Sequence, residues 1–350
     1  LHARERAITE RYAMRITVLC TTVGIALFVA ATIAAESTSD SGRMLLYVDN
    51  SLGDDLTVVD LGSLKVVDTI RVGSEPHGLC APAGGRRLFA TIEGEKNLKT
   101  IETSTGKILD TIPLTGRPNE CAATPDGQYV GVPIRDADSV DIVDTRLKKV
   151  VKVLPIKAPH NCFNAGNNHD MYVSSMGSDE IDVIDLRTIE YSARIPTGGI
   201  PRPYSVSNDE KTLYSALTNL HGFVIVDIPG RKVIERVELP PAPPLACPLE
   251  VNTPTHGLAL TPDGRQLWIT SLADAGVYVY DLARKEPSPM IHVGKCPNWI
   301  AFSPDGKYCA VSNSDSNDCS IIDTDKQREV ARLKVGKGPK RVLVVNVPTH

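Results

Sequence analysis

The sequence predicts an all-β protein, a seven-bladed β-propeller, from three observations. A unit of four short apolar runs separated by turn residues repeats along the chain. A proline opens successive copies at intervals of between 41 and 51 residues, at Pro76, Pro118, Pro159, Pro203, Pro254, Pro297 and Pro339. An acidic residue closes the third run of every copy, at Asp60, Glu102, Asp144, Asp185, Asp227, Asp281 and Asp323. Seven marks of each kind predict seven blades of four antiparallel strands.

The stretch from Cys296 to Gly336 shows this unit most clearly. Its four predicted strands are Asn298–Phe302, Lys307–Val311, Cys319–Ile322 and Val330–Val335. The turn 303–306 reads Ser-Pro-Asp-Gly, in which proline presets φ and glycine supplies a positive φ. The connections are too short for a parallel crossover, so neighbouring strands are expected to run antiparallel.

The two ends of the repeat region predict how the ring closes. Met44–Val48 has no preceding strand with an opening proline, so it corresponds to the second strand of a unit, followed by Leu56–Val59 and Val66–Val72. Arg341–Val347 corresponds to a first strand with nothing after it. We therefore expect a closing blade of three N-terminal strands and one C-terminal strand, which removes open sheet edges.

The N-terminal region has the pattern of a targeting segment. Met14–Ala35 contains a short positive region at Arg15, an apolar stretch and a small-residue end. Residues 1–35 are expected to be a leader and signal peptide with the true start at Met14, residues 36–43 a linker, and residues 44–350 a single propeller. Cleavage would leave no membrane span and an exported, periplasmic or extracellular protein. The alternative is an uncleaved membrane anchor.

Composition supports one globular ring and argues against a nucleic-acid partner. Hydrophobic residues make up 42% of the 350 residues, which is ample for a core between blades. The formal charge is −4 and the pI is about 6.1, without a long basic run. These values give no electrostatic footprint for nucleic acid.

Seven cysteines remain beyond the predicted signal peptide, and none lies in a C-x-x-C motif. Cys309 and Cys319 lie on adjacent predicted strands and could form a disulfide. Cys247 and Cys296 lie in loops on one face and could also pair. Buried free thiols are the alternative for both pairs.

Several short motifs resemble the YVTN-type repeat family of propellers. They are the run Met-Leu-Leu-Tyr-Val-Asp-Asn at 44–50, the Pro-Asp-Gly turns at 125–127, 262–264 and 304–306, and the Val-Gly-x-x-Pro links at 72–76 and 293–297. The resemblance covers the expected propeller and implies its fold. That family and its relatives include binding proteins, lactonase-like proteins and redox-enzyme domains, so the resemblance leaves the activity open.

One polar position per blade predicts a site at the mouth of the central channel. Alignment of the innermost strands stacks His77, Asn119, His160, Tyr204, His256, Asn298 and Lys340. Convergent polar groups at such a mouth are typical of a ligand-binding site. The expected ligand is a protein, a carbohydrate or a small molecule.

The same ring suggests a metal. His77, His160 and His256 could hold copper or zinc, because neutral imidazole is a common ligand of both. The alternative is that these rings hydrogen-bond to water and to neighbouring loops. Acidic loops on the same face could bind calcium or attract a cationic partner, although turn chemistry also explains them; they contain Asp54, Asp55, Glu93, Glu95, Asp136, Asp138, Asp179, Glu180, Asp315 and Asp318.

Three functions remain open from the sequence. The first is an exported binding or interaction protein with its site at the channel mouth. The second is a metal- or cofactor-assisted enzyme, lactonase-like or redox, that uses the three histidines. The third is an envelope or surface structural protein. No local catalytic motif such as G-x-S-x-G or H-E-x-x-H is present, and propeller sites assembled from separate blades need none.

Overall fold

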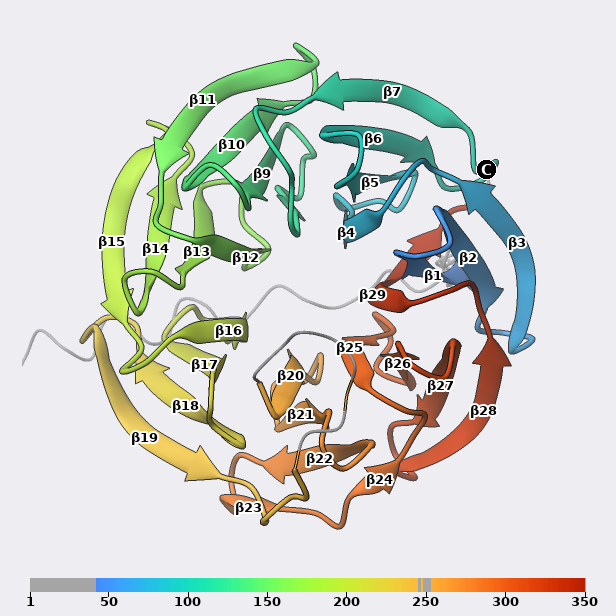
Figure 1. The fold of residues 1–350 in the computed structure, drawn as a ribbon, viewed down its shortest axis with the longest axis vertical. Coiled ribbons are helices and arrows are strands. Elements are labelled where there is room, and N and C mark those ends of the chain that lie inside the picture. The colour runs from blue at the N-terminus through green and yellow to red at the C-terminus, as the bar shows by residue number, and fades with distance from the viewer. Residues whose placement is uncertain (1–41, 245–246, 248–252, 350) are drawn as a thin grey trace, which may run out of the picture. The chain divides into compact units, whose positions relative to one another are not determined.

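The computed structural model describes residues 42–244, 247 and 253–349, and it confirms the predicted all-β architecture. Within those residues 29 strands form seven antiparallel sheets around a common axis (Figure 1), without a helix. The part of the chain that the structure describes thus contains no helix long and apolar enough to cross a membrane.

Each sheet is one blade, whose first strand lies nearest the axis and whose last strand lies outside (Figure 1). Blade 1 comprises β4 (Pro76–Cys80), β5 (Arg87–Ile92), β6 (Asn97–Glu102) and β7 (Ile108–Pro113). Blade 2 comprises β8 (Ala122–Ala123), β9 (Tyr129–Ile134), β10 (Ser139–Asp144) and β11 (Lys149–Pro155). Blade 3 comprises β12 (Pro159–Asn164), β13 (Asp170–Ser175), β14 (Glu180–Asp185) and β15 (Glu190–Pro196).

The remaining blades repeat this order. Blade 4 comprises β16 (Pro201–Val206), β17 (Thr212–Leu217), β18 (Gly222–Asp227) and β19 (Lys232–Glu238). Blade 5 comprises β20 (Thr255–Leu260), β21 (Gln266–Ser271), β22 (Gly276–Asp281), β23 (Glu286–Pro287) and β24 (Ile291–His292), the last two both paired with β22. Blade 6 comprises β25 (Pro297–Phe302), β26 (Tyr308–Asn313), β27 (Asp318–Asp323) and β28 (Arg328–Lys334).

The seventh blade joins the two ends of the propeller, as predicted. The C-terminal strand β29 (Pro339–Val347) pairs antiparallel with β1 (Arg43–Asn50), followed by β2 (Asp55–Asp60) and β3 (Lys65–Arg71). Leu46 faces Val344 in this register, and both side chains are buried. The closing contact is therefore a full strand ladder with an apolar interior.

The core lies between blades rather than inside one blade. One buried cluster combines Tyr47 of blade 7 with Leu88 and Ile92 of blade 1. Between blades 5 and 6, the fully buried ring of Trp268 lies 5.3 Å from the ring of Phe302 in an edge-to-face arrangement. No blade buries its faces alone, so the ring behaves as one cooperative unit.

A bulge near the start of the inner strand recurs in six blades. In blade 1 the register shifts between Pro76 and Gly78, which leaves the Gly78 N–H outside the ladder. The Thr91 hydroxyl of β5 accepts that N–H at 2.8 Å. Ser174, Thr270 and Ser312 accept the corresponding N–H in blades 3, 5 and 6. A bulge changes the direction of the side chains beside it, so the same local irregularity orients the residue that follows the opening proline or threonine of the inner strand.

The acidic residue that closes the third run caps the following turn in five blades. The carboxylate at the end of the third strand accepts backbone N–H groups of the following turn at Asp60, Asp144, Asp185, Asp281 and Asp323. Two carboxylates of the loops joining the second and third strands bind the next blade instead. Asp54 accepts the N–H of Glu75, and Asp138 accepts the N–H of Ala158. These loop carboxylates join neighbouring blades, which supports the interpretation as turn chemistry.

One of the two predicted disulfides is present in the structure. Cys247 and Cys296 form a disulfide, which ties the segment before blade 5 to the start of blade 6. Cys309 and Cys319 are free and buried, so that predicted pairing is wrong. Both sulfurs lie in the apolar packing between blades, where free thiols act as small hydrophobic groups.

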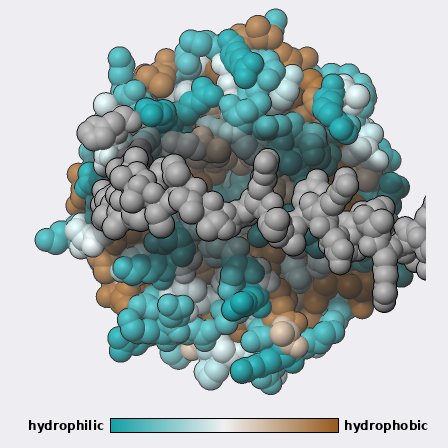
Figure 2. Space-filling model, turned by 180° about the vertical axis from the view of Figure 1, so that it is seen from behind, coloured by the Kyte–Doolittle hydropathy of each residue, from teal (hydrophilic) through white to brown (hydrophobic). Residues whose placement is uncertain are grey.

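Hydrophilic and hydrophobic residues both reach the face shown in Figure 2, opposite the view of Figure 1. The large exposed apolar side chains include Leu52, Leu147 and Ile234, which belong to three different blades. Single exposed apolar side chains of this kind are normal on soluble proteins and carry no functional argument.

Removal of the closing strand should open the ring. Deletion of residues 339–350 exposes the edge of β1 and the apolar side chains that β29 covers, so we expect the cooperative thermal transition to be lost or to fall by more than 10 °C, on the order of several kcal/mol. Deletion of residues 348–350 is the control, because it leaves β29 intact. Calorimetry showing an unchanged Tm after the longer deletion would contradict the closure.

Candidate functional site

One polar side chain per blade follows the opening position of the inner strand. Pairing of the strands defines the opening positions as Pro76, Pro118, Pro159, Pro201, Thr255, Pro297 and Pro339, each opposite the end of a second strand. The residues that follow them are His77, Asn119, His160, Arg202, His256, Asn298 and Lys340. The structure thus places six of the seven predicted residues at equivalent positions.

Blade 4 differs from the sequence alignment by two residues. Pro201, not Pro203, pairs with Leu217 at the opening position, so Arg202 and not Tyr204 follows it. The hydroxyl of Tyr204 donates to the backbone carbonyl of Tyr172 at 2.7 Å inside a buried cluster. The sequence offers two prolines separated by one residue, and only strand pairing decides between them.

A buried carboxylate organises the mouth at blade 1. Glu93 follows β5, and its Oε2 lies 2.7 Å from Nδ1 of His77. Its Oε1 accepts hydrogen bonds from Arg117 at 2.9 Å and from Arg135 at 3.1 Å. Burial alone would raise the pKa of Glu93, but these donors, His77 first, hold it at about 2. The Glu93 carboxylate is therefore ionised and forms charge-assisted hydrogen bonds with both arginines.

Blade 3 carries a chain of polar contacts that fixes His160. The Asn161 amide nitrogen donates to Glu120, so the Asn161 oxygen must accept, and it lies 2.6 Å from Nδ1 of His160. Nδ1 therefore carries the proton, and Nε2 is left as an acceptor that faces Arg202 at 3.4 Å. Burial, followed by the charge of Arg202, lowers the pKa of His160 well below its usual range.

The other two histidines have the same tautomer. Nδ1 of His256 lies 2.8 Å from the backbone oxygen of Asn298, which can only accept, and Nδ1 of His77 faces a carboxylate. Burial lowers the pKa of each ring to about 3. All three rings are thus neutral at physiological pH and keep an Nε2 lone pair.

Arg341 lies deeper in the channel, two positions after Pro339, and is 2% exposed. Its guanidinium carbon lies 3.8 Å from the ring centroid of Trp299 in blade 6. Its Nε lies 3.5 Å from an oxygen of Glu120 in blade 2, beyond good hydrogen-bond geometry. Both Nε and one Nη of Arg341 are buried without a hydrogen-bond partner among the described residues.

Asp49 of β1 occupies the place that a hydroxyl takes in the bulges of other blades. Its Oδ1 accepts the Lys340 N–H at 3.2 Å, and its fully buried Oδ2 has no hydrogen-bond partner in the described part of the chain. Burial raises the pKa of Asp49 to about 7, against the lowering effect of Arg341 and Lys340. The Oδ1 atoms of Asn119 and Asn298 are likewise buried and unpaired.

The site carries an excess of positive charge. Its cations are Arg117, Arg135, Arg202, Lys340 and Arg341, and its acids are Asp49, Glu75, Glu93 and Glu120. Burial raises the pKa of Asp49 and that of Glu120, which weakens two of the four negative charges. Burial, followed by the charge of Arg135, lowers the pKa of Arg202. Burial also lowers the pKa of Lys340, and the charges of Arg341 and Arg135 lower it further, so these cations repel one another.

The predicted histidine metal site does not form. No group of three or more His, Cys, Asp or Glu side chains among the described residues is arranged to hold a metal ion. Each Nδ1 of His77, His160 and His256 instead binds a separate partner on the protein. Of the loop carboxylates proposed for calcium, Asp54 and Asp138 accept backbone N–H groups, and Asp55 and Asp318 accept asparagine side chains. The described residues thus show no ready-made ligand group for copper, zinc or calcium.

Four functional side chains escaped the alignment of single positions. Glu120 and Arg341 lie one residue beyond the aligned polar position, and Asp49 and Glu93 lie at the ends of second strands. Alignment across blades of the residue after each aligned polar position, and of the residues at the ends of the second strands, would have found these four side chains. Arg202 was missed because of the double proline.

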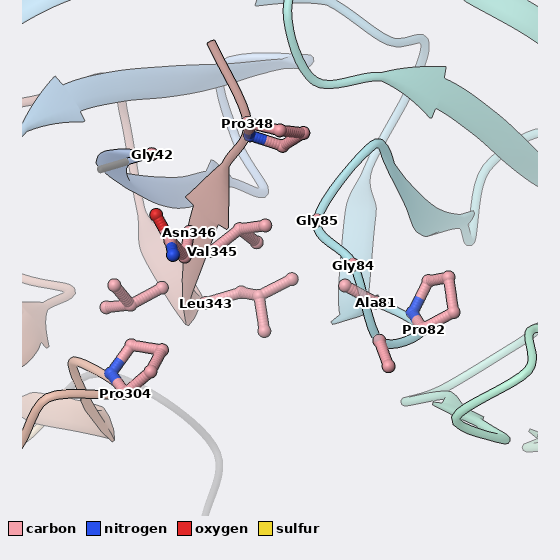
Figure 3. Close-up of a pocket in the computed structure, with 12 residues that line it drawn as sticks. Gly42, Ala81, Pro82, Gly84, Gly85, Pro304, Leu343, Val345, Asn346 and Pro348 are labelled. Atoms are coloured by element: carbon pink, nitrogen blue, oxygen red, sulfur yellow. The ribbon is translucent and has the colours of Figure 1, made fainter. Parts of the chain in front are cut away.

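A separate cavity opens away from this mouth, among the turns that join first and second strands (Figure 3). It has a volume of about 450 Å³ and is lined by Ala81, Pro82, Gly85, Pro304, Leu343 and Asn346, among others. A Cβ on Gly85, which has φ of +65°, would lie 1.9 Å from the Asn346 carbonyl oxygen. The close packing requires glycine there, and the lining offers no ionisable group.

The neutral histidines make stability depend on pH. Their pKa values are lower in the folded chain than in the unfolded chain, so unfolding takes up protons below about pH 6.5. The free energy of unfolding should fall by up to about 1.4 kcal/mol per pH unit for each ring as pH drops from 6.5 toward 4. The raised pKa of Asp49 acts in the opposite sense, because the folded chain binds its proton between about pH 4 and 7.

A histidine variant separates the contribution of one histidine to the pH dependence of stability from the opposite contribution of Asp49. His256→Gln should flatten the slope of unfolding free energy against pH by one proton between pH 6 and 4.5, measured by denaturant titration. His292→Gln is the matched control, because His292 is exposed on blade 5. An unchanged slope in the His256 variant would show that this ring is protonated in the folded chain.

Comparison with known proteins agrees with this architecture. Residues 85–250 match the YNCE-like beta-propeller family. Antigen Lp49 of Leptospira interrogans is 30% identical over 149 residues, which are 41% of this chain and 30% of that protein. The matched segment thus spans less than a third of that relative.

Two solved structures share the fold at low identity. A putative 6-phosphogluconolactonase from Bacteroides uniformis has a TM-score of 0.71 and 15% identity, covering 87% of this chain and 100% of that chain. The dihydro-heme d1 dehydrogenase NirN has a TM-score of 0.63 and 16% identity, covering 85% of this chain and 74% of that chain. Lactonase-like and redox-enzyme propellers are therefore among its structural neighbours, as the sequence resemblance implied. The chain is a seven-bladed β-propeller that carries the YNCE-like signature over residues 85–250.

Proposed function

We propose that this protein binds a small anionic ligand at the channel mouth, as an exported binding protein. The observation that supports this most directly is the set of cations that the protein does not neutralise. Lys340 is partly buried, and its Nζ has no hydrogen-bond or ion-pair partner within the described residues. Partial removal of this charge from water without a partner costs free energy, and an anion at the mouth would reduce that cost.

Arg202 and Arg135 complete the cationic group. Arg202 contacts only neutral groups, Nε to the Thr218 hydroxyl at 2.9 Å and Nη1 to His160 at 3.4 Å. Arg135 shares Glu93 with Arg117, and Arg117 also pairs with Glu75 at 3.5 Å, so Arg135 has no carboxylate of its own among the described residues. Cations from blades 2, 4 and 7 thus face one mouth, although the whole chain has a formal charge of −4. Such a concave, single-sign site concentrates and orients anions.

The neutral rings and amides give the site its selectivity. Guanidinium groups recognise carboxylate and phosphate by paired N–H donors, and the Nε2 atoms of three histidines add acceptors for hydroxyl groups. A small hydroxylated carboxylate or phosphate suits this combination. Export is supported by the N-terminal pattern and by the Cys247–Cys296 disulfide, since disulfides persist in oxidising compartments. The predicted signal peptide itself lies outside the described residues. The expectation of no nucleic-acid partner stays a prediction.

A panel of small probes tests the anionic class. Citrate, gluconate and inorganic phosphate should raise the Tm in a concentration-dependent way at constant ionic strength, whereas glucose at the same concentrations should not. Lys340→Gln should weaken binding of the best anion by about 10-fold to 100-fold, the value of one charge-assisted contact, measured by calorimetry.

Lys337→Gln is the matched control, because it removes the same charge from an exposed residue three positions away. Equal losses in the two variants would point to a general charge effect and contradict a built site. Lack of any anion-dependent shift in the wild type would contradict the proposal itself. Mass spectrometry of the ligand extracted from denatured, freshly purified protein would identify the natural anion.

An enzymatic function remains the second candidate, and one observation favours it. The three histidines are neutral beside cations, and the Nε2 atoms of His77 and His256 have no hydrogen-bond partner among the described residues, which places proton acceptors next to anion-stabilising groups. The structural neighbour described as a putative 6-phosphogluconolactonase suggests a phosphorylated lactone as the probe.

Turnover separates the two functions. Hydrolysis of 6-phosphogluconolactone is measured by the release of acid at constant pH. Under the binding proposal, the wild-type protein leaves the rate of hydrolysis at its uncatalysed value. Under the enzymatic alternative, the wild type accelerates hydrolysis and His160→Gln lowers kcat by about 100-fold or more, the usual contribution of a general base. His292→Gln is again the control in both cases.

A further inference from the structure

Two cysteines from neighbouring blades meet in the buried cluster between blades 1 and 2. Cys80 ends β4, and Cys121 immediately precedes β8. Their sulfur atoms lie 2.7 Å apart, and both residues are buried, at 8% and 3% exposure. Unbonded heavy atoms attract best at roughly 3.5–4.0 Å, and sulfur is larger than carbon, so two thiols at this distance repel.

The surroundings offer the two thiols no compensation. Among the described residues, the Cys121 sulfur makes one other polar contact, a weak one of 4.0 Å to the Phe89 carbonyl oxygen. Burial raises the pKa of both thiols, and the charge of Glu120 raises both further, whereas Arg341 lowers that of Cys121. The third nearby cysteine, Cys162 of blade 3, also has a raised pKa through burial. Neither thiol is therefore placed as a nucleophile or a metal ligand.

We propose that Cys80 and Cys121 are a site of oxidative modification and form an inter-blade disulfide. The pairing needs only a small shortening, from 2.7 Å to the usual S–S length of about 2.05 Å. It removes the repulsive contact and links two strands that share no backbone ladder within one sheet. The chain already forms one disulfide, Cys247–Cys296, so an oxidising environment is consistent with the structure.

The reaction balances as a thiol–disulfide exchange. One deprotonated cysteine attacks an oxidised disulfide, such as oxidised glutathione or a disulfide oxidoreductase, and releases one thiol of that oxidant. The second cysteine then attacks the mixed disulfide and releases the other thiol. Two electrons and two protons pass from Cys80 and Cys121 to the oxidant. Because the folded ring buries both thiols, exchange is expected before blades 1 and 2 pack together.

The bond would also hold part of the ligand site. Cys121 follows Glu120, the carboxylate that accepts from Asn161 and lies opposite Arg341. A cross-link at Cys121 restrains the backbone that presents this carboxylate to the channel. The inference stands independently of the proposed anion, since it rests on the two sulfur positions alone.

Peptide mapping without reduction tests the pairing directly. The full chain is refolded in a glutathione redox buffer, alkylated while denatured and digested with trypsin. The expected product links residues 72–86, which contain Cys80, to residues 108–135, which contain Cys121, and it disappears on reduction. The Cys247–Cys296 link in the same digest is the internal control that oxidation occurred.

Two outcomes overturn the proposal. One is alkylation of both Cys80 and Cys121 in a sample where Cys247 and Cys296 are linked. The other is a link from Cys121 to residues 158–187, which contain Cys162. A double variant, Cys80→Ala with Cys121→Ala, should lower the Tm by about 5 °C or more, and reductant should lower its Tm less than that of the wild type. Cys309→Ala is the matched control for loss of a buried sulfur, and its Tm should keep the full response to reductant.

Discussion

Pairing of β29 with β1 is the constraint on which the rest of the molecule depends. Every blade packs its faces against its neighbours, so no blade has a complete core until the last gap is closed. Closure is achieved by a strand ladder with buried side chains on both faces of the sheet. The same strand delivers Lys340 and Arg341 to the channel. Stability and the chemistry of the mouth therefore depend on one element.

The channel mouth follows from a repeated local device. In each of six blades a bulge near the start of the inner strand frees a backbone N–H. In four of these blades a hydroxyl of the adjacent strand accepts that N–H, at Thr91, Ser174, Thr270 and Ser312. In the closing blade Asp49 takes this role and brings a buried charge with it. Similar backbones thus present different side chains, and the sum of those side chains is cationic.

The fold was predictable because its signals are local and repeated. Turn residues and the acidic caps act within a few positions, and their recurrence gave both the number of blades and the closing blade. Contacts between blades were harder to infer. Strand pairing with Leu217, not sequence, selects Arg202 over Tyr204. Glu93 was recognised only as a loop acid, because its partners Arg117 and Arg135 come from the next blade.

The order of the propeller strands, with β29 after all the others, has a consequence for synthesis. A nascent chain can assemble its blades in order, but the cations at 340 and 341 emerge only after the other six inner strands. Until then the three histidines have no positive neighbours from blade 7, and the gap between blades 6 and 1 stays open to water. The proposed anion site is therefore complete only once β29 has been made, and a chain that stops before β29 lacks both the closing strand ladder and these two cations.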